Sequence, residues 1–360
     1  MCGVFGFVTI YPRSTEQSSG EIDTGLTRIR HRGPDGTGKW ISPNGQVGLG
    51  HVRLSIIDIE SGAQPMHSDD GRYTIIYNGE IYNYIELRKE LGDDLFQTHS
   101  DTEVVLRAFQ RWGDDCVTHL RGMFAIAIWD EVEQRLFLAR DRFGIKPLYW
   151  AKTSTGLYFA SEVKALLPFL DSRQVNSAAL SDYFSFQFCL EQKTMMEGVV
   201  QLPAAHFAML SPGQQPKHQR YWEIHYVADY NHSEEWFTER LQELLCDSVQ
   251  VHLRADVDIG SYVSGGVDSS LLASLAREVR PDGPFKVFNG RFLDGLDFDE
   301  SHYAKALADE QNMQLHVADI SEQDFVDHIA KVIWHLDQPI AGPGSFPQYM
   351  VSKLSLIHIS

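Results

Sequence analysis

"MCGVFGFVTI", residues 1–10, opens the chain with a cysteine, a glycine and an apolar run typical of a buried β-strand. Cys2 becomes the first residue if the initiator methionine is removed, which is expected when the next side chain is small. The thiol and a free α-amine then belong to one residue. The amine titrates near ~7.7–8.0 and the thiol near ~8.5, so the amine is a well-matched general base. The stretch therefore predicts a nucleophile that carries its own base; the alternative is a chance Met-Cys start.

The first two thirds of the chain carry an α+β pattern around this start. Residues 84–91 and 102–113 place apolar side chains at helical spacing. Short strand-like runs, each bounded by turn residues, are predicted at 3–10, 73–78, 123–130, 135–141, 156–161 and 206–210. Many strands and few helices predict a sheet-rich domain with helices packed outside it.

The last third changes character after a linker near residues 227–233. Residues 233–253 form an amphipathic helical pattern with Ser233 as the N-cap. Its predicted apolar stripe consists of Phe237, Leu241, Leu244, Leu245, Val249 and Leu253. Strand-like runs at 257–263, 285–290 and 314–320 are separated by helical segments, an order that predicts βαβ units and a parallel sheet.

Composition narrows the class of protein. The length of 360 residues predicts two domains, and a net charge of -18 disfavours nucleic-acid binding. No run approaches the ~20 apolar residues of a membrane helix, and the start lacks the pattern of a signal peptide, so a cytoplasmic location without a membrane partner is expected. The four cysteines are far apart, which predicts neither a zinc site nor a disulfide framework.

Further candidate residues lie in the first two thirds. Arg53 stands beside an apolar strand in "GHVRLSIID" (50–58), Asn78, Gly79 and Glu80 are expected at the end of a strand in "YNGEIYN" (77–83), and Asp101 is expected just before a helix. Each has a structural alternative. Arg53 fits a surface strand residue, Asn-Gly is a common hairpin turn, and an aspartate often caps a helix.

Taken together, these segments resemble a known domain. From Cys2 to about Glu223 the chain resembles the class II glutamine amidotransferases of the N-terminal-nucleophile hydrolase type, a resemblance that implies an αββα sandwich. The matching segments are "MCGVFGF", "RHRGPD", "HVRLSIID", "YNGEIYN", "SDTEV", "RGMFAIAIWD", "RDRFGIKPLY" and "FASEVKAL".

The resemblance implies roles for individual residues. Cys2 resembles the nucleophile that attacks the carboxamide of glutamine, and Asn78 and Gly79 resemble the oxyanion hole. Arg53 resembles the clamp on the substrate α-carboxylate, and Glu80 and Asp101 resemble the acceptors for its α-ammonium. Three apolar residues would line the same pocket, namely Leu54, Ile56 and Ile57.

A second motif lies in the last third, where "SYVSGGVDSS" (261–270) runs from a strand into a helix. Its glycines allow a tight turn, and a helix N-terminus suits a phosphate. The segment is neither a Walker A loop nor a dinucleotide fingerprint. It resembles the pyrophosphate loop of adenine-nucleotide α-hydrolase-like enzymes, with ATP expected at Val263, Ser264, Gly265, Gly266, Asp268 and Ser269 and with Mg²⁺ expected at Asp268.

The two halves in this order resemble the glutamine-hydrolysing asparagine synthetases, as do the downstream segments at 297–308 and 333–354. The resemblance implies glutamine, aspartate and ATP as substrates, with β-aspartyl-AMP as intermediate and ATP and Mg²⁺ as cofactors. It predicts a glutaminase domain at 2–225, the N-terminal part of a synthetase domain at 226–354 and a foreign tail at 355–360. The family continues past this point, so a C-terminally truncated fragment is expected. Homodimers are common in the family.

Several alternatives remain open. Related enzymes amidate other carboxylates, and this fragment could act as a glutaminase alone. Amidotransferases that make phosphoribosylamine or glucosamine phosphate share the first domain, but the "SGGVDS" loop argues against them. Cys2 argues against β-lactam synthetase-like proteins, and the intact candidate site argues against a non-catalytic module.

Overall fold

The computed structural model describes residues 1–293, 299–339, 342 and 344–359. Internal contacts divide the chain into two units, Met1–His225 and Tyr226–Ser360. Parts of the quoted segments, namely residues 297–298, 340–341, 343 and 360, lie outside the described residues. In the part of the chain that is described, no helix has the length and apolar content to cross a membrane.

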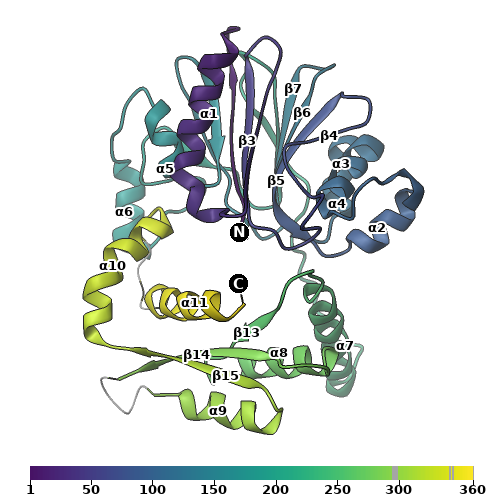
Figure 1. Cartoon of the computed structure of the whole chain (residues 1–360), viewed down its shortest axis with the longest axis vertical. Coiled ribbons are helices and arrows are strands. Elements are labelled where there is room, and N and C mark those ends of the chain that lie inside the picture. Colours follow the sequence, from purple (N-terminus) through teal and green to yellow (C-terminus); the bar gives the residue numbers. More distant parts are fainter. Residues whose placement is uncertain (294–298, 340–341, 343, 360) are drawn as a thin grey trace. The chain divides into compact units, whose positions relative to one another are not determined.

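The first unit contains two six-stranded antiparallel sheets (Figure 1). The first sheet has the spatial order β10 (Val199–Gln201), β8 (Tyr149–Lys152), β9 (Gly156–Ala160), β1 (Gly3–Thr9), β3 (Val47–Arg53) and β2 (Gly36–Ile41). The second sheet has the order β12 (Lys217–Arg220), β11 (His206–Leu210), β7 (Arg135–Arg140), β6 (Gly122–Asp130), β5 (Tyr73–Ile81) and β4 (Met66–His67). Every strand-like run predicted for this unit is confirmed.

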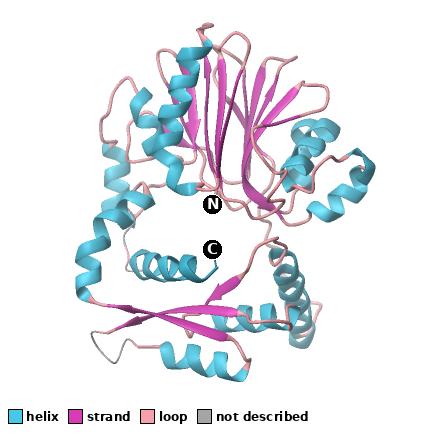
Figure 2. Cartoon of the chain, viewed as in Figure 1, coloured by secondary structure: helices cyan, strands magenta, loops and turns pink. Residues whose placement is uncertain are grey.

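Three apolar cores hold this unit together. The core between the sheets joins Val4, Val47 and Leu49 of the first sheet to Ile76 and Trp129 of the second. A second core lies between the first sheet and helices α1 (Thr15–Ile29) and α5 (Val163–Leu166). A third lies between the second sheet and helices α2 (Tyr84–Leu91), α3 (Asp101–Trp112) and α4 (Cys116–His119). Figure 2 shows the resulting helix–sheet–sheet–helix layers, which confirm the predicted αββα sandwich.

Helix α1 was not foreseen from the sequence, because its apolar pattern is weak. Ser14 caps it in a capping box with Gln17. A Cβ atom on Gly25 would lie 2.5 Å from the ring of Phe5, so this glycine lets α1 pack directly on β1. The remaining elements of the unit are α6 (Ser177–Phe186) and short 3-10 turns at Arg30–Arg32, Asp93–Leu95, Gly113–Asp115 and Leu167–Phe169.

The second unit is built on three parallel strands, β13 (Gly260–Tyr262), β14 (Lys286–Phe292) and β15 (Gln314–Ile320), as predicted. Its helices are α7 (Glu234–His252), α8 (Val267–Val279), α9 (Ser301–Glu310), α10 (Glu322–Leu336) and α11 (Ser345–Ile359). Ser233 caps α7 by accepting a bond from the Trp236 N–H at 3.3 Å. The predicted stripe of α7 is only partly buried, since Phe237, Leu241 and Leu244 are exposed while Val249 and Leu253 are buried.

The predicted foreign tail continues helix α11 as far as Ile359. The hydroxyl of Ser355 lies 2.9 Å from that of Tyr262, and the carbonyl of His358 accepts a bond from Lys286 Nζ at 2.7 Å. The foreign origin of this tail stays a prediction.

Candidate active site

One pocket of the first unit collects every residue predicted for the glutamine site. Cys2 reaches it from the start of β1, Arg53 from the end of β3, Asn78, Gly79 and Glu80 from β5, and Asp101 from the start of α3. The complete lining consists of Met1, Cys2, Arg53, Leu54, Ile56, Ile57, Gly62, Gln64, Tyr77, Asn78, Gly79, Glu80, Ser100, Asp101, Thr102 and Lys146.

Cys2 stands just before β1, whose side chains are all buried. Its Sγ lies 3.4 Å from the backbone nitrogen and 3.5 Å from the carbonyl oxygen of Leu54. Burial raises the pKa of the Cys2 thiol above its ordinary value. The thiol is therefore protonated at neutral pH, so a base must take its proton before it can attack.

The chain's α-amine, which Met1 carries in this structure, also lies at the pocket, and the amine of Cys2 would replace it once Met1 is removed. The pKa of the chain's α-amine, here on Met1, is lowered to about 6, chiefly by burial, and the positive charges of Arg32 and Lys146 act in the same direction. An amine with such a pKa is mostly neutral at pH 7 and able to accept a proton.

Asn78 presents an unused hydrogen-bond donor to the pocket. The residue is 1% exposed, and its Nδ2 has no partner among the described residues. A buried donor left unpaired costs about 1–3 kcal/mol, and such groups in native structures call for a functional explanation. The hairpin-turn alternative for Asn78-Gly79 is wrong, because both residues lie inside β5, which continues to Ile81.

Gly79 lies too close to the neighbouring strand for any side chain. A Cβ atom there would stand 2.2 Å from the carbonyl oxygen of Met123 on β6. The absence of a side chain keeps β5 tight against β6 and leaves the Gly79 backbone bare on the pocket wall.

Arg53 is held by a loop of backbone carbonyls. Its Nη1 donates to Ile59 O at 3.0 Å, and its Nη2 donates to the carbonyls of Asp58 at 2.5 Å and Ile57 at 3.3 Å. No carboxylate of the described residues forms an ion pair with it. Arg53 is the half-buried last residue of β3, and the pocket wall carries its guanidinium, whose charge a substrate carboxylate would balance.

Asp101 is the first residue of α3, where Ser100 is the N-cap. Its Oδ2 accepts bonds from the Tyr77 hydroxyl at 2.9 Å and the Ile81 N–H at 3.0 Å. Its pKa is raised to about 6, chiefly by burial, with the negative charge of Glu80 acting in the same direction. A cation that enters the pocket would stabilise the ionised form.

Sequence reasoning missed part of the lining. Gln64 accepts a bond from the Tyr77 N–H at 2.6 Å and donates to Thr102 at 3.1 Å, so it fixes two pocket walls. A Cβ on Gly62 would lie 2.6 Å from Arg53 Nη2, so this glycine makes room for the guanidinium. Lys146 lies within the segment "RDRFGIKPLY", for which the resemblance implies no individual role. No local pattern marks these residues.

A second pocket, of about 420 Å³, lies in the second unit. Val263, Ser264 and Ser269 line it as predicted, whereas Gly265, Gly266 and Asp268 of the same loop do not. Gly265 has a φ of +99°, a backbone conformation that favours glycine. The other lining residues are Tyr262, Phe288, Asn289, Gly290, Phe292, Glu300, Pro347, Gln348 and Val351.

The loop between β13 and α8 is ordered by its own serines. The hydroxyls of Ser264 and Ser269 lie 3.0 Å apart, and Ser269 Oγ accepts a bond from the Ser264 N–H at 3.2 Å. Gly266 is the N-cap of α8. Asn289 is 3% exposed and its Oδ1 has no partner among the described residues, so this pocket also offers an unused acceptor.

The chain matches two family models. Residues 1–222 match the family described as "Glutamine amidotransferase domain", and residues 240–355 match the family described as "Asparagine synthase".

Three relatives are similar along nearly the whole chain. "Asparagine synthetase [glutamine-hydrolyzing] 1" of Bacillus subtilis is 37% identical over 100% of this chain and 56% of the relative. "Amidase chry2" of Gibberella zeae is 33% identical over 94% of this chain and 54% of the relative. A relative from Methanocaldococcus jannaschii is 32% identical over 99% of this chain and 72% of its own length. The chain thus spans about half the length of the first two relatives.

Proposed function

The chain belongs to the family of glutamine-hydrolysing asparagine synthetases, and on that premise we propose that its first unit, residues 2–225, hydrolyses glutamine at Cys2. The observation that carries the proposal is the unpartnered Nδ2 of buried Asn78 in the same pocket as the Cys2 thiol. Together they supply a nucleophile and a donor for the negative charge that develops when it attacks.

The chemistry follows from these groups. After Met1 is removed, Cys2 Sγ bonds to the carboxamide carbon of glutamine, and the thiol proton passes to the α-amine of Cys2. Asn78 Nδ2 and the Gly79 N–H donate to the resulting oxyanion. The C–N bond then breaks, the amine returns the proton to the leaving nitrogen, and ammonia and a γ-glutamyl thioester form. Water hydrolyses the thioester to glutamate and restores the thiol.

The charged residues of the pocket would orient the substrate. Arg53 would bind the α-carboxylate of glutamine, and Asp101 with Glu80 would bind its α-ammonium. Leu54, Ile56 and Ile57 would contact the aliphatic part. These contacts are the same in the ground state and the transition state, so they set the KM for glutamine more than the kcat.

For the second unit, residues 226–354, we propose ATP-dependent activation of aspartate. The carboxylate would attack the α-phosphorus of ATP to give β-aspartyl-AMP and pyrophosphate, and ammonia would then displace AMP to give asparagine. Val263, Ser264, Gly265, Gly266, Asp268 and Ser269 would surround the phosphates, with the N-terminus of α8 beside them.

Mg²⁺ would neutralise charge on the triphosphate. This metal usually binds through one or two carboxylates together with waters and substrate phosphates. Asp268, exposed in the first turn of α8, fits the role of one such carboxylate. The described residues contain no group of three His, Cys, Asp or Glu side chains able to hold a metal, so the triphosphate would provide most of its ligands.

The location and partners of the enzyme follow from its proposed substrates. We propose a cytoplasmic location, where glutamine, aspartate and ATP are supplied, and no nucleic-acid or membrane partner. A homodimer stays a prediction from the family.

Product analysis tests the proposed function directly. A full-length version of the enzyme is incubated with glutamine and ATP, together with aspartate or one of a panel of other carboxylic acids. We expect glutamate in every mixture, and asparagine, AMP and pyrophosphate with aspartate. One relative is named an amidase, so other acids are included in the panel. If AMP forms with another acid and not with aspartate, that acid replaces aspartate as the proposed acceptor. Glutamate without AMP from any acid would overturn the synthetase proposal and leave a glutaminase.

A further inference from the structure

A buried carboxylate outside the glutamine pocket is linked to the nucleophile. Glu162 follows β9, is 3% exposed and receives three bonds from basic side chains. Arg32 Nη1 donates to its Oε1 at 2.8 Å, His31 Nε2 lies 3.1 Å from the same oxygen, and Lys164 Nζ donates to its Oε2 at 2.5 Å. Burial alone would raise the pKa of Glu162, but the hydrogen bond with His31, the charge of Arg32 and the hydrogen bonds from Lys164 and Arg32 lower it to about 2, so the carboxylate is ionised at any working pH.

Arg32 connects this carboxylate to Cys2. Its Nε donates to the backbone carbonyl oxygen of Cys2 at 2.9 Å, while its Nη1 is fixed by Glu162. A guanidinium is planar and rigid, so two bonds at separate nitrogens set both its place and its tilt. The direction of the Cys2 carbonyl therefore depends on Glu162.

Ser161, the residue before Glu162, holds the start of β1, the strand that directly follows Cys2. Ser161 N–H donates to Val4 O at 2.9 Å, and its Oγ accepts a bond from the Val4 N–H at 2.9 Å. Ser161 and Glu162 thus fix both sides of Gly3, directly beside the nucleophile. Because a free N-terminal residue has only one peptide neighbour, its orientation depends on such contacts more than that of an internal residue does.

From this geometry we propose that Glu162 is a positioning residue for the nucleophile, acting through Arg32 on the Cys2 carbonyl. This inference rests on the proposed glutaminase function. With the carbonyl fixed, the backbone of Cys2 is anchored, and its thiol and α-amine keep one direction relative to the pocket. Glu162 touches neither glutamine nor the reacting atoms, so its loss should affect turnover and leave substrate binding unchanged.

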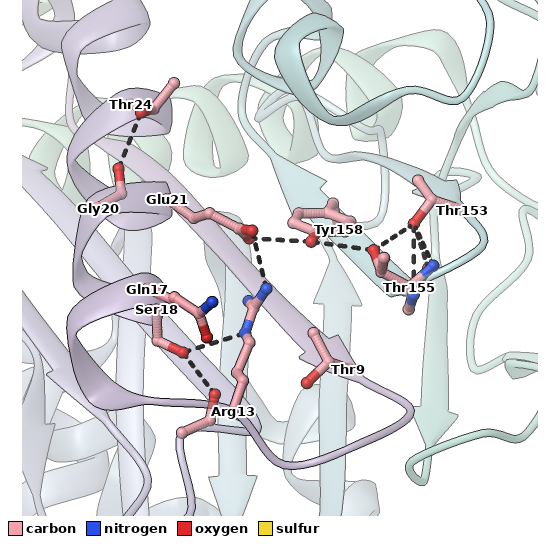
Figure 3. A network of polar contacts seen from close by, with 12 residues as sticks. Thr9, Arg13, Gln17, Ser18, Gly20, Glu21, Thr24, Thr153, Thr155 and Tyr158 are labelled. Atoms are coloured by element: carbon pink, nitrogen blue, oxygen red, sulfur yellow. Dashed lines mark hydrogen bonds and ion pairs between the residues drawn. The ribbon is translucent and has the colours of Figure 1, made fainter.

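A buried ion cluster could instead contribute to folding alone, and the substitution Glu162→Gln separates the two roles. It keeps the size of the side chain and removes its charge. The matched control is Glu21→Gln. Glu21 accepts bonds from Arg13 at 2.8 Å and from the Tyr158 hydroxyl at 2.9 Å, and this network does not include Cys2 (Figure 3).

The test compares glutamine hydrolysis and thermal unfolding in the wild type and both variants. We expect E162Q to lower kcat about 10- to 100-fold with the glutamine KM within about twofold, since a small misplacement of a reacting group has costs of this size. E21Q should keep both constants. If E162Q does not fold, Glu162→Asp, which keeps the charge and withdraws it by one methylene, is assayed in the same way and should also lower kcat.

Each outcome decides a separate claim. Wild type without any glutaminase activity overturns the proposed function. Active wild type with an unchanged kcat in folded E162Q or E162D overturns the positioning role, as does a change in KM with kcat retained. A drop in kcat confined to the Glu162 variants supports it.

Discussion

The sulfur of Cys2 lies 3.4 Å from the backbone nitrogen of Leu54, the residue directly after Arg53. The sulfur of the predicted nucleophile therefore contacts the peptide group between Arg53 and Leu54, directly beside the predicted carboxylate clamp, although Cys2 and Arg53 are far apart in the sequence. Antiparallel pairing of β1 with β3, which places Gly3 opposite Val52, brings them together. The first sheet fixes the position of Arg53 relative to the thiol. It would therefore also set where the carboxamide of a substrate bound by Arg53 lies.

Replacing Cys2 by alanine should abolish glutamine hydrolysis. The substitution removes the only atom proposed to form a bond with the substrate. The fold should persist, because β1 is held by Phe5, Phe7 and its two neighbouring strands. Glutamate release and circular dichroism check both points, with Cys189→Ala as the control. Glutamine turnover by pure, folded C2A would contradict the assignment.

Replacing Arg53 by alanine should raise the glutamine KM about 10- to 100-fold, because a charge-assisted hydrogen bond contributes about 1.5–3 kcal/mol. The kcat at saturation should change little. Arg88→Ala removes another arginine that binds backbone and a carboxylate, away from the pocket, and should leave KM unchanged. An unaltered KM in R53A, measured from initial rates, would rule out the clamp.

Replacing Asn78 by alanine should lower kcat about 10²- to 10³-fold, since one oxyanion donor typically has this effect. The KM should stay near its wild-type value, because the oxyanion exists only in the transition state. The exposed Asn44 offers a control substitution, Asn44→Ala, with no expected effect. If N78A turned over glutamine at the wild-type rate, the unpaired Nδ2 would need another explanation.

The glutamine KM should rise as the pH falls below about 6. Burial raises the pKa of Asp101 to about 6, so the carboxyl group loses its charge below that value and can no longer pair with an ammonium group. The expected slope is about tenfold per pH unit, and KM should be constant between pH 7 and 8. In Asp101→Asn the KM should be high at every pH and lack this slope. A wild-type KM independent of pH from 5 to 8 would argue against an ionised Asp101 in the complex.

The sequence predicted the strands of the sandwich, but the partners of each strand could not be read from it. Apolar runs bounded by turn residues identified β1, β5, β6 and β7, because strands buried on both faces are apolar at successive positions. Asn78 and Gly79 were expected at a strand end and lie inside β5, because an asparagine and a glycine interrupt its apolar run. Helix α1 escaped notice because its apolar stripe is short, with Ile22, Leu26 and Ile29 buried on the first sheet beside Ser18 and Gly25.

The candidate site was found by resemblance and not by periodicity. Arg53 and Asn78 each had a plausible structural role in isolation, and only the fold shows that they share a pocket. Glu162 and Arg32 are 130 positions apart, so their ion pair depends on how β9 meets the turn after α1. Such pairs follow from tertiary packing, which no local pattern records.

The central claim is that the chain's own α-amine serves Cys2 as the base, and the state of Met1 tests it most directly. Intact-mass spectrometry and N-terminal labelling should be performed on the same preparation as the glutaminase assay. We predict that all activity belongs to molecules that lack Met1 and carry a free amine on Cys2, and that blocking this amine abolishes turnover. Full activity in a preparation that retains Met1, or in which the amine is blocked, would contradict the account.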